Sequence, residues 1–219
     1  MDQLLINSYY NKDDEQLVIE RIGAIPMPQP LTNEEQKLLL KIAADAVYAA
    51  AHRQRPPELD LAALPPALQA EGASFVTLTK RGQLRGCIGT LQAYQPLALD
   101  VQERALQAAI EDPRFPPLRP DELPTIEIEI SRLTEPVPLP YDRPEDLPKA
   151  LHPGIDGVVL QDGFRRATFL PQVWEELPDP EVFLSQLCLK MGASPDLWRR
   201  KLLDVSIYNV EEFKGKPEW

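Results

Sequence analysis

One short segment concentrates the residues that could do chemistry. Residues Leu84–Gly89 read Leu-Arg-Gly-Cys-Ile-Gly and hold one of only two cysteines and two of the ten glycines in the chain. Residues two apart in a strand point to the same face, so we expect Arg85 and Cys87 to share one. Glycine inside a strand is typical of a bulge or of a close approach by another group. We expect one of these features at Gly86 and at Gly89. We therefore expect a thiol, a cation and bare backbone to meet in one hollow.

Three interpretations of Cys87 stay open: a buried thiol that fills space, a binding-site thiol and a catalytic thiol. A neighbouring cation such as Arg85 lowers the pKa of a thiol, and the thiolate is the reactive form. Catalysis by cysteine usually also needs a base, most often histidine. The chain has two histidines. His52 falls at the exposed end of a predicted helix, and His152 falls in a loop, from which it could approach the segment.

Further candidates for the same site lie downstream. Arg114, like Arg85, could hold an anionic ligand through paired hydrogen bonds. Either arginine could instead form a structural ion pair with Glu127 or Glu129. These two glutamates share a strand face. Paired carboxylates of this kind can carry out acid–base or metal chemistry, or they can simply form a solvent-exposed face of the strand. Phe115 lies in a proline-rich loop and could line a pocket or fill the core.

The sequence shows no metal-ligand spacing and no phosphate-binding loop. It contains no Cys-x-x-Cys, no His-Glu-x-x-His and no calcium-loop pattern, so we expect no metal site. Gly82, Gly86 and Gly89 lack the lysine-serine or lysine-threonine ending of a phosphate loop. Cys188 lies in an apolar helical stretch and is predicted to be core. No particular cofactor is indicated.

Composition is that of a globular protein, with 219 residues, 43% of them hydrophobic and 26% charged. The net charge of -11 argues against broad nucleic-acid binding, which needs a basic surface. We expect a cytoplasmic protein with reduced thiols, because there is no long apolar run, no signal-peptide pattern and no disulfide framework. The 24 prolines, about twice the usual share, are one route to heat stability and suggest a thermophilic source.

The predicted elements give an α+β fold with mainly antiparallel sheets and packed helices, because close hairpins alternate with helices. Residues 1–30 read as an extension with an edge strand at 16–22, and residues 31–219 as the main domain. The proline-rich connector at 134–150 is a candidate boundary between two lobes. In chain order we expect a helix (32–54), a hairpin (74–80 and 83–91), a helix (96–111), a strand (126–131), a hairpin (157–161 and 164–170), a helix (179–191), a short helix (194–198) and a final strand (205–213).

Several blocks, in this order, resemble the AMMECR family, named for the AMME-syndrome chromosomal region protein. They are Leu84–Thr90, Asp112–Leu118, Glu127–Ser131 and Leu170–Val173. The resemblance covers about residues 32–213. It implies an α+β domain with two unequal lobes, and a functional centre at Leu84–Gly89. It also implies prokaryotic relatives encoded beside a Memo-like protein and a radical S-adenosylmethionine protein, which are the partners it suggests. It supplies no reaction.

Three functions are compatible with these observations. The first is an accessory or binding module that engages a partner protein or a small ligand in a groove formed by Leu84–Gly89, Asp112–Leu118 and the Glu127/Glu129 face. The alternative is a cysteine-dependent enzyme that acts through Cys87 on a small molecule or a modified nucleotide. The third is an RNA-linked regulator, which the acidic charge disfavours.

Overall fold

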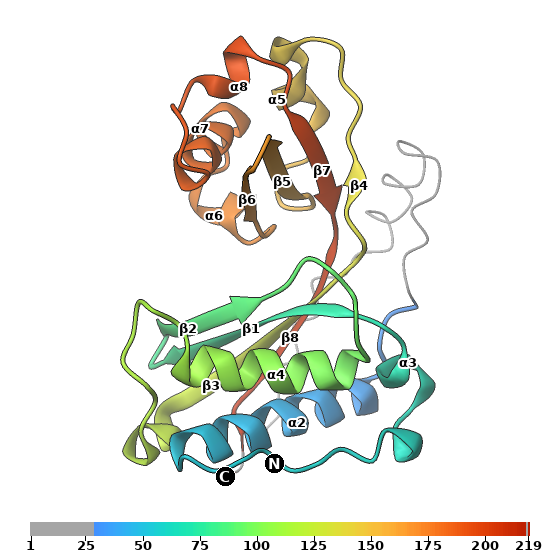
Figure 1. Cartoon of the computed structure of the whole chain (residues 1–219), viewed down its shortest axis with the longest axis vertical. Helices are drawn as coiled ribbons and strands as arrows, with labels where there is room; N and C mark the ends of the chain where they lie inside the picture. Colours follow the sequence, from blue (N-terminus) through green and yellow to red (C-terminus); the bar gives the residue numbers. More distant parts are fainter. Residues whose placement is uncertain (1–28, 218) are drawn as a thin grey trace. The chain divides into compact units, whose positions relative to one another are not determined.

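The computed structural model describes residues 29–217 and 219, which form two compact units. Unit 1 holds the described residues up to Glu135 and those from Glu211 onward, and unit 2 is Pro136–Val210. Each unit has its own hydrophobic core and its own four-stranded sheet with helices (Figure 1). The fold class is therefore α+β, as predicted. The strand expected at 16–22 lies outside the described residues. No helix in the described part is long and apolar enough to cross a membrane.

Unit 1 is a sheet with the strand order β2-β1-β3-β8, and α2 and α4 cover one of its faces (Figure 1). The elements of this unit are α2 (Asn33–Ala51), η1 (Leu61–Ala63), α3 (Pro66–Gln69), β1 (Ala73–Lys80), β2 (Gln83–Gly89), α4 (Leu97–Ile110), η2 (Pro120–Thr125), β3 (Ile126–Leu133) and β8 (Val210–Gly215). Val76, Leu78, Ile128 and Ile130 point from the strands into the core under the helices. We call the opposite face of this sheet the outer face.

Local signals account for the first helix and the first hairpin. The Thr32 side chain accepts a hydrogen bond from the Glu35 N–H, and the Glu35 carboxylate accepts one from the Thr32 N–H, which is the predicted capping box. Arg81 and Gly82, at the tip between β1 and β2, have φ of 53° and 78°. Positive φ at both positions suits a two-residue turn whose twist matches the strands. The predicted helix and hairpin are both present.

Unit 2 is a second sheet, with the strand order β4-β7-β5-β6. Its elements are β4 (Val137–Pro138), η3 (Pro144–Asp146), α5 (Leu147–Ala150), β5 (Gly157–Asp162), β6 (Arg165–Phe169), α6 (Val173–Glu176), α7 (Pro180–Lys190), α8 (Leu197–Arg200) and β7 (Asp204–Tyr208). Cys188 is fully buried in the core of this unit, as expected. The proline-rich connector predicted at 134–150 contains regular structure as well as loop, because β4 and α5 lie within it.

The final strand predicted at 205–213 is wrong, because it is two strands in two sheets. β7 ends at Tyr208 and β8 begins at Val210, so one residue separates them. Ile207 is buried in the core of unit 2, whereas Phe213 is buried in the core of unit 1. Alternation of apolar and polar residues is the same for one long strand and for two short ones in line.

Prolines lie along the outer edge of β4. The Leu139 N–H donates to the Val205 carbonyl at 2.9 Å, so Leu139 directs its backbone groups toward β7. Pro138 and Pro140 flank it, and alternation turns their backbone groups away from β7. Because proline has no N–H, this edge offers no donor at those two positions.

Candidate functional site

The segment Leu84–Gly89 forms β2, but a β-bulge separates the two residues expected to act together. Thr79 pairs with Leu84 and Leu78 pairs with Gly86, so Arg85 is an additional residue in the strand. Thr77 pairs with Cys87. The predicted shared face for Arg85 and Cys87 is therefore wrong, because the bulge breaks the alternation between them. Leu84 and Cys87 share the outer face instead.

Arg85 is buried in a structural ion pair. Its guanidinium donates to both oxygens of Glu122, at 3.1 and 3.0 Å, and to the Pro116 carbonyl at 2.9 Å. Lys80 donates to the same carboxylate at 2.8 Å. The hydrogen bonds from Arg85, followed by those from Lys80, lower the pKa of Glu122 to about 2 against the effect of burial. The expectation of an ion pair holds, but the partner is Glu122 and neither glutamate of β3.

Arg114 pairs with Asp112, and together they close the edge of β2 at Cys87. The Cys87 N–H donates to the Asp112 carboxylate at 2.9 Å. The Arg114 guanidinium donates to the same carboxylate at 2.6 and 2.9 Å, and to the Cys87 carbonyl at 3.4 Å. Both backbone groups of Cys87 thus have side-chain partners on the side of β2 that faces away from β1, and β2 is an end strand of the sheet formed by the described residues. Hydrogen bonds from Arg114 lower the pKa of Asp112 to about 2.

Phe115 contributes a half-buried ring beside both arginines. The guanidinium carbon of Arg114 lies 5.5 Å from the centre of this ring, and that of Arg85 lies 5.8 Å from it. These distances are within the range of cation–π attraction. Phe115 therefore lies between the two ion pairs that hold β2 in place.

A line of polar side chains crosses the outer face from strand to strand. Cys87 on β2 and Glu129 on β3 both pair with Thr77, which lies between them on β1. The Thr77 hydroxyl donates to the Cys87 sulfur at 3.2 Å. On the neighbouring strand β8, Glu212 interacts with the Glu129 carboxyl and helps to raise its pKa. We call Cys87, Thr77, Glu129 and Glu212 the polar row, and it brings together two of the predicted site residues.

The Glu129 carboxyl of the polar row has a raised pKa. Burial, and then the charge and hydrogen bond of Glu212, raise the pKa of Glu129 to about 7, although Lys214 acts in the opposite direction. Glu127, the other predicted carboxylate on this face, pairs with Thr79. Its charge adds to the shift at Glu129.

Cys87 is not placed as an activated nucleophile. Burial raises the pKa of its thiol, and this outweighs the hydrogen bond from Thr77 and the charge of Arg114, which lower it. A nucleophilic cysteine needs the opposite shift. His52 stacks on Tyr48 at the end of α2, with 4.2 Å between the ring centres. His152 belongs to unit 2, where it lies 3.6 Å from the buried carboxylate of Asp156.

Close packing accounts for the two glycines of the segment. A Cβ atom on Gly86 would lie 2.1 Å from the Ala108 carbonyl oxygen, which belongs to the backbone of α4. A Cβ atom on Gly89 would lie 2.2 Å from the Phe75 ring. Real Cβ atoms do not approach this closely, so both positions require glycine for packing.

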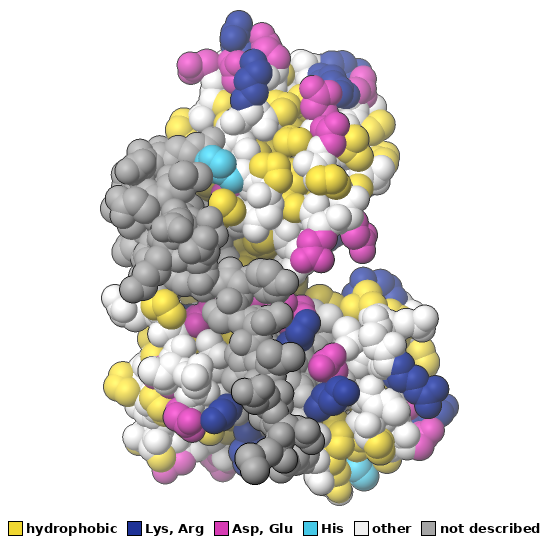
Figure 2. Space-filling model, turned by 180° about the vertical axis from the view of Figure 1, so that it is seen from behind, with side chains coloured by type: hydrophobic (Ala, Val, Ile, Leu, Met, Phe, Trp, Pro, Cys, Tyr) yellow, Lys and Arg dark blue, Asp and Glu magenta, His cyan; other side chains and the backbone are white. Residues whose placement is uncertain are grey.

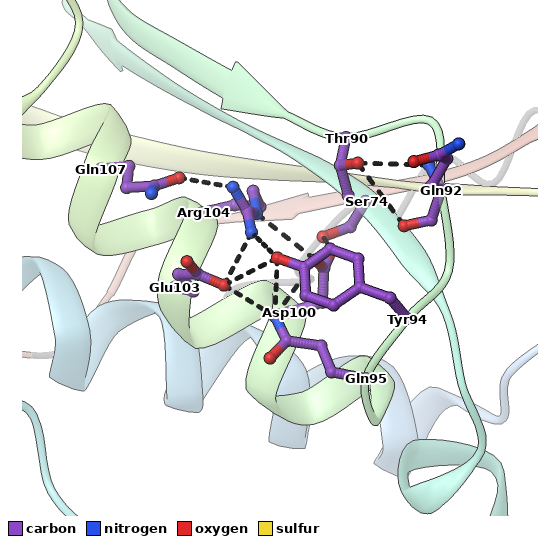
Figure 3. Close-up of polar contacts among 9 residues, drawn as sticks. All are labelled: Ser74, Thr90, Gln92, Tyr94, Gln95, Asp100, Glu103, Arg104 and Gln107. Carbon is purple, nitrogen blue, oxygen red and sulfur yellow. Dashed lines mark hydrogen bonds and ion pairs between the residues drawn. The ribbon is translucent and has the colours of Figure 1, made fainter.

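A second polar cluster, which the sequence did not indicate, fixes the loop after β2 (Figure 3). Asp100 on α4 is fully buried and accepts a hydrogen bond from the Ser74 hydroxyl at 2.7 Å. Arg104 donates to Asp100 at 3.3 Å and to Glu103 at 2.6 Å. It also donates to the Tyr94 hydroxyl, in the loop between β2 and α4. Because these groups satisfy one another, the cluster has a structural role in holding this loop to the helix.

The described residues offer neither a metal cluster nor a basic surface on the face seen in Figure 2. No group of three or more His, Cys, Asp or Glu side chains in the described part could hold a metal ion. Among the described residues on the face shown in Figure 2, lysine and arginine side chains lie interspersed with acidic ones. A broad positive area, which binding to the phosphates of RNA requires, is not seen there.

Several residues of the site were missed from the sequence. Asp112 stood in a block that the sequence comparison singled out, but only as part of a loop. Thr77 is an ordinary strand residue, and only the register of β1 reveals its place between Cys87 and Glu129. Glu212 had no usable signal, because β8 was not separated from β7.

Comparisons with known proteins agree with this architecture. A protein of Thermofilum pendens is 41% identical over 196 residues, which cover 84% of this chain and 91% of that protein. A protein of Methanothermobacter thermautotrophicus is 41% identical over 169 residues, covering 76% and 87%. The crystal structure of the uncharacterised protein PH0010 from Pyrococcus horikoshii superimposes with a TM-score of 0.79 at 30% identity, covering 85% of this chain and 94% of that one. The AMMECR1 family model matches residues 40–213, and the chain belongs to the AMMECR1 family.

Proposed function

We propose that this chain is an accessory binding module whose recognition surface is the outer face of the unit 1 sheet, centred on the polar row. The observation that carries the proposal is the alignment of the Cys87 thiol, the Thr77 hydroxyl and the Glu129 carboxyl across three neighbouring strands. The thiol belongs to the segment Leu84–Gly89. These groups offer hydrogen bonds at fixed spacing, while the burial of Cys87 leaves its thiol protonated at neutral pH. Recognition fits this arrangement better than covalent catalysis does.

The structure supports a rigid surface. The Arg85–Glu122 and Arg114–Asp112 ion pairs fix β2 from two sides, and Gly86 lets α4 approach the strand closely. Side chains on strands held in this way lose little conformational entropy when a partner binds. The occupant we favour is a partner protein, and the Memo-like and radical S-adenosylmethionine proteins suggested by the family are the first candidates.

Isothermal titration calorimetry of the full chain with each of these two proteins tests the proposal by measuring the dissociation constant of any complex. We expect a complex with at least one of them. Thr77→Val removes a hydroxyl from the row at nearly constant volume, and Glu129→Gln removes a titrating carboxyl. Each should weaken the complex about tenfold, equivalent to roughly 1.4 kcal/mol. Glu34→Gln is the matched control, since Glu34 is an exposed glutamate in the first turn of α2.

Two outcomes oppose the proposal. If neither protein binds, the partner-protein version is wrong, and shifts of the outer-face amides on titration with small molecules would then identify a small-ligand module. If a complex forms and Thr77→Val and Glu129→Gln bind as tightly as the control variant, the outer face is not the recognition surface.

A further inference from the structure

Unit 2 contains a groove on the face of its sheet that is opposite the core. On β7, Val205 is buried in the core, so Asp204 and Ser206 on either side of it point to the other face. Gln161 on β5 pairs with Asp204, and Pro138 on β4 pairs with Ser206. Paired residues of antiparallel strands point to the same face, so these four side chains gather over three neighbouring strands. All four line the groove.

The groove has apolar walls and a volume that suits a small molecule. Pro140, Tyr141 and the exposed Leu202 also line it, and its volume is about 460 Å³. Small-molecule sites measure roughly 300–1,000 Å³ and combine apolar walls with a few polar groups. The Tyr141 hydroxyl donates to the Leu203 carbonyl at 2.8 Å and accepts from the Leu203 N–H at 2.7 Å. These two bonds fix the side chain, so its ring is the part that can contact an occupant.

The groove carries a negative charge that has no partner. In the part of the chain that the structure describes, no side chain forms an ion pair or a hydrogen bond with the Asp204 carboxylate. Asp162, at the end of β5, is by contrast held by Arg165 and Lys201. The charge of Asp204 acts on Tyr141, where it adds to burial in raising the pKa of the hydroxyl, against the hydrogen bond to the backbone. Because an aromatic ring also attracts cations, the carboxylate and the ring favour the same kind of occupant.

We propose that this groove is a binding site for a small organic cation, in which an ammonium or guanidinium group is carried on an apolar body. The charged group lies against the Asp204 carboxylate and the Tyr141 ring, and the body lies against Pro138, Pro140 and Leu202. The site belongs to unit 2 and is separate from the outer face of unit 1, so neither proposal depends on the other.

Titration of the full chain at pH 7 with phenethylammonium, followed through the backbone amide shifts by NMR, tests the proposal. Phenethyl alcohol and hydrocinnamate are the matched probes, because they keep the aromatic body and replace the cation by a neutral or an anionic group. We expect saturable shifts at Gln161, Asp204 and Ser206 with the cation. Both matched probes should bind about tenfold more weakly.

Asp204→Asn removes the charge at nearly constant volume and should weaken the binding of phenethylammonium about fivefold, on the scale of an exposed ion pair. Glu176→Gln is the matched control, since Glu176 is an exposed carboxyl at the end of α6 and does not line the groove. It should bind the cation as tightly as the unmodified chain does.

The proposal is overturned if the groove amides show no saturable shift, if phenethyl alcohol binds as tightly as the cation, or if Asp204→Asn binds as tightly as Glu176→Gln. A second measurement covers the case in which Asp204→Asn does not fold. Raising the ionic strength to about 0.5 M should weaken the binding of phenethylammonium to the unmodified chain and leave that of phenethyl alcohol unchanged. Equal effects of salt on the two probes would also exclude recognition of the charge.

Discussion

The Cys87 N–H donates a 2.9 Å hydrogen bond to the carboxylate of Asp112, which lies 25 residues later in the chain. The same carboxylate holds Arg114, whose guanidinium reaches back to the Cys87 carbonyl. An ion pair from a loop thus takes the place that a neighbouring strand would occupy beside Cys87. The blocks around Cys87 and Asp112, distant in sequence, are two halves of one local structure.

Asp112→Ala should destabilise the chain by about 2–3 kcal/mol, because the Cys87 N–H and the Arg114 guanidinium both lose their acceptor. Asp112→Asn keeps an acceptor without the charge and should cost less. Urea unfolding measures both variants. The pKa of Asp112 is lowered from 3.8 to about 2, so its contribution is present above pH 4 and is lost as the pH falls toward 2. This account would be contradicted if Asp112→Ala destabilised the chain as much at pH 2 as it does at pH 7.

Gly86→Ala should cost about 3 kcal/mol, because the new Cβ meets the backbone of α4 and a main-chain oxygen cannot rotate away. Thermal unfolding followed by circular dichroism gives the comparison. Gly82→Asn is the matched control, since nothing lies within 4 Å of its Cβ position and asparagine tolerates the positive φ there. Equal stability of Gly86→Ala and the control would show that α4 can move away from β2.

Arg85→Met should destabilise the chain by roughly 3–5 kcal/mol, because it removes the two-pronged ion pair of the buried Glu122 carboxylate and leaves it the ion pair with Lys80. Arg85→Lys keeps the charge but loses the two-pronged geometry, and should fall between the wild type and Arg85→Met. Chemical denaturation at pH 7 distinguishes the three proteins. Exposed ion pairs contribute roughly 1 kcal/mol or less to stability. If Arg85→Met is destabilised by no more than that, the buried pair contributes as little as an exposed one.

Cys87 should react with iodoacetamide slowly, and its rate should rise with pH with a midpoint above that of a free thiol, because burial raises the pKa of this group. Cys188→Ala leaves a single thiol and removes ambiguity in mass spectrometry. A midpoint below the free-thiol value of about 8.5 would favour the cysteine-dependent enzyme over the binding module.

Much of the fold followed from local patterns. The capping box at Thr32, the turn at Arg81 and Gly82, and the alternation of Ile126, Ile128 and Ile130 each specify their element with neighbours in sequence. The division between β7 and β8 did not follow, because Ile207 and Phe213 fit one alternating strand equally well. Only the separate cores of the two units distinguish the two arrangements.

The candidate site was predictable in composition but not in geometry. Cys87 and Glu129 were both identified, yet their alignment through Thr77 depends on the register of three strands, which carries no local signal. The bulge at Arg85 reversed the expected relationship between Arg85 and Cys87. A single additional residue in a strand is invisible to a period-two pattern that is read from sequence alone.

Pro138 and Pro140 have a consequence for how these molecules behave in a crowded solution. A strand from another chain that approached β4 would meet carbonyl oxygens but no amide hydrogens at these two positions. Growth of the unit 2 sheet from molecule to molecule is thereby discouraged on that side. The pyrrolidine rings of Pro138 and Pro140 therefore oppose pairing with another strand along this edge of β4.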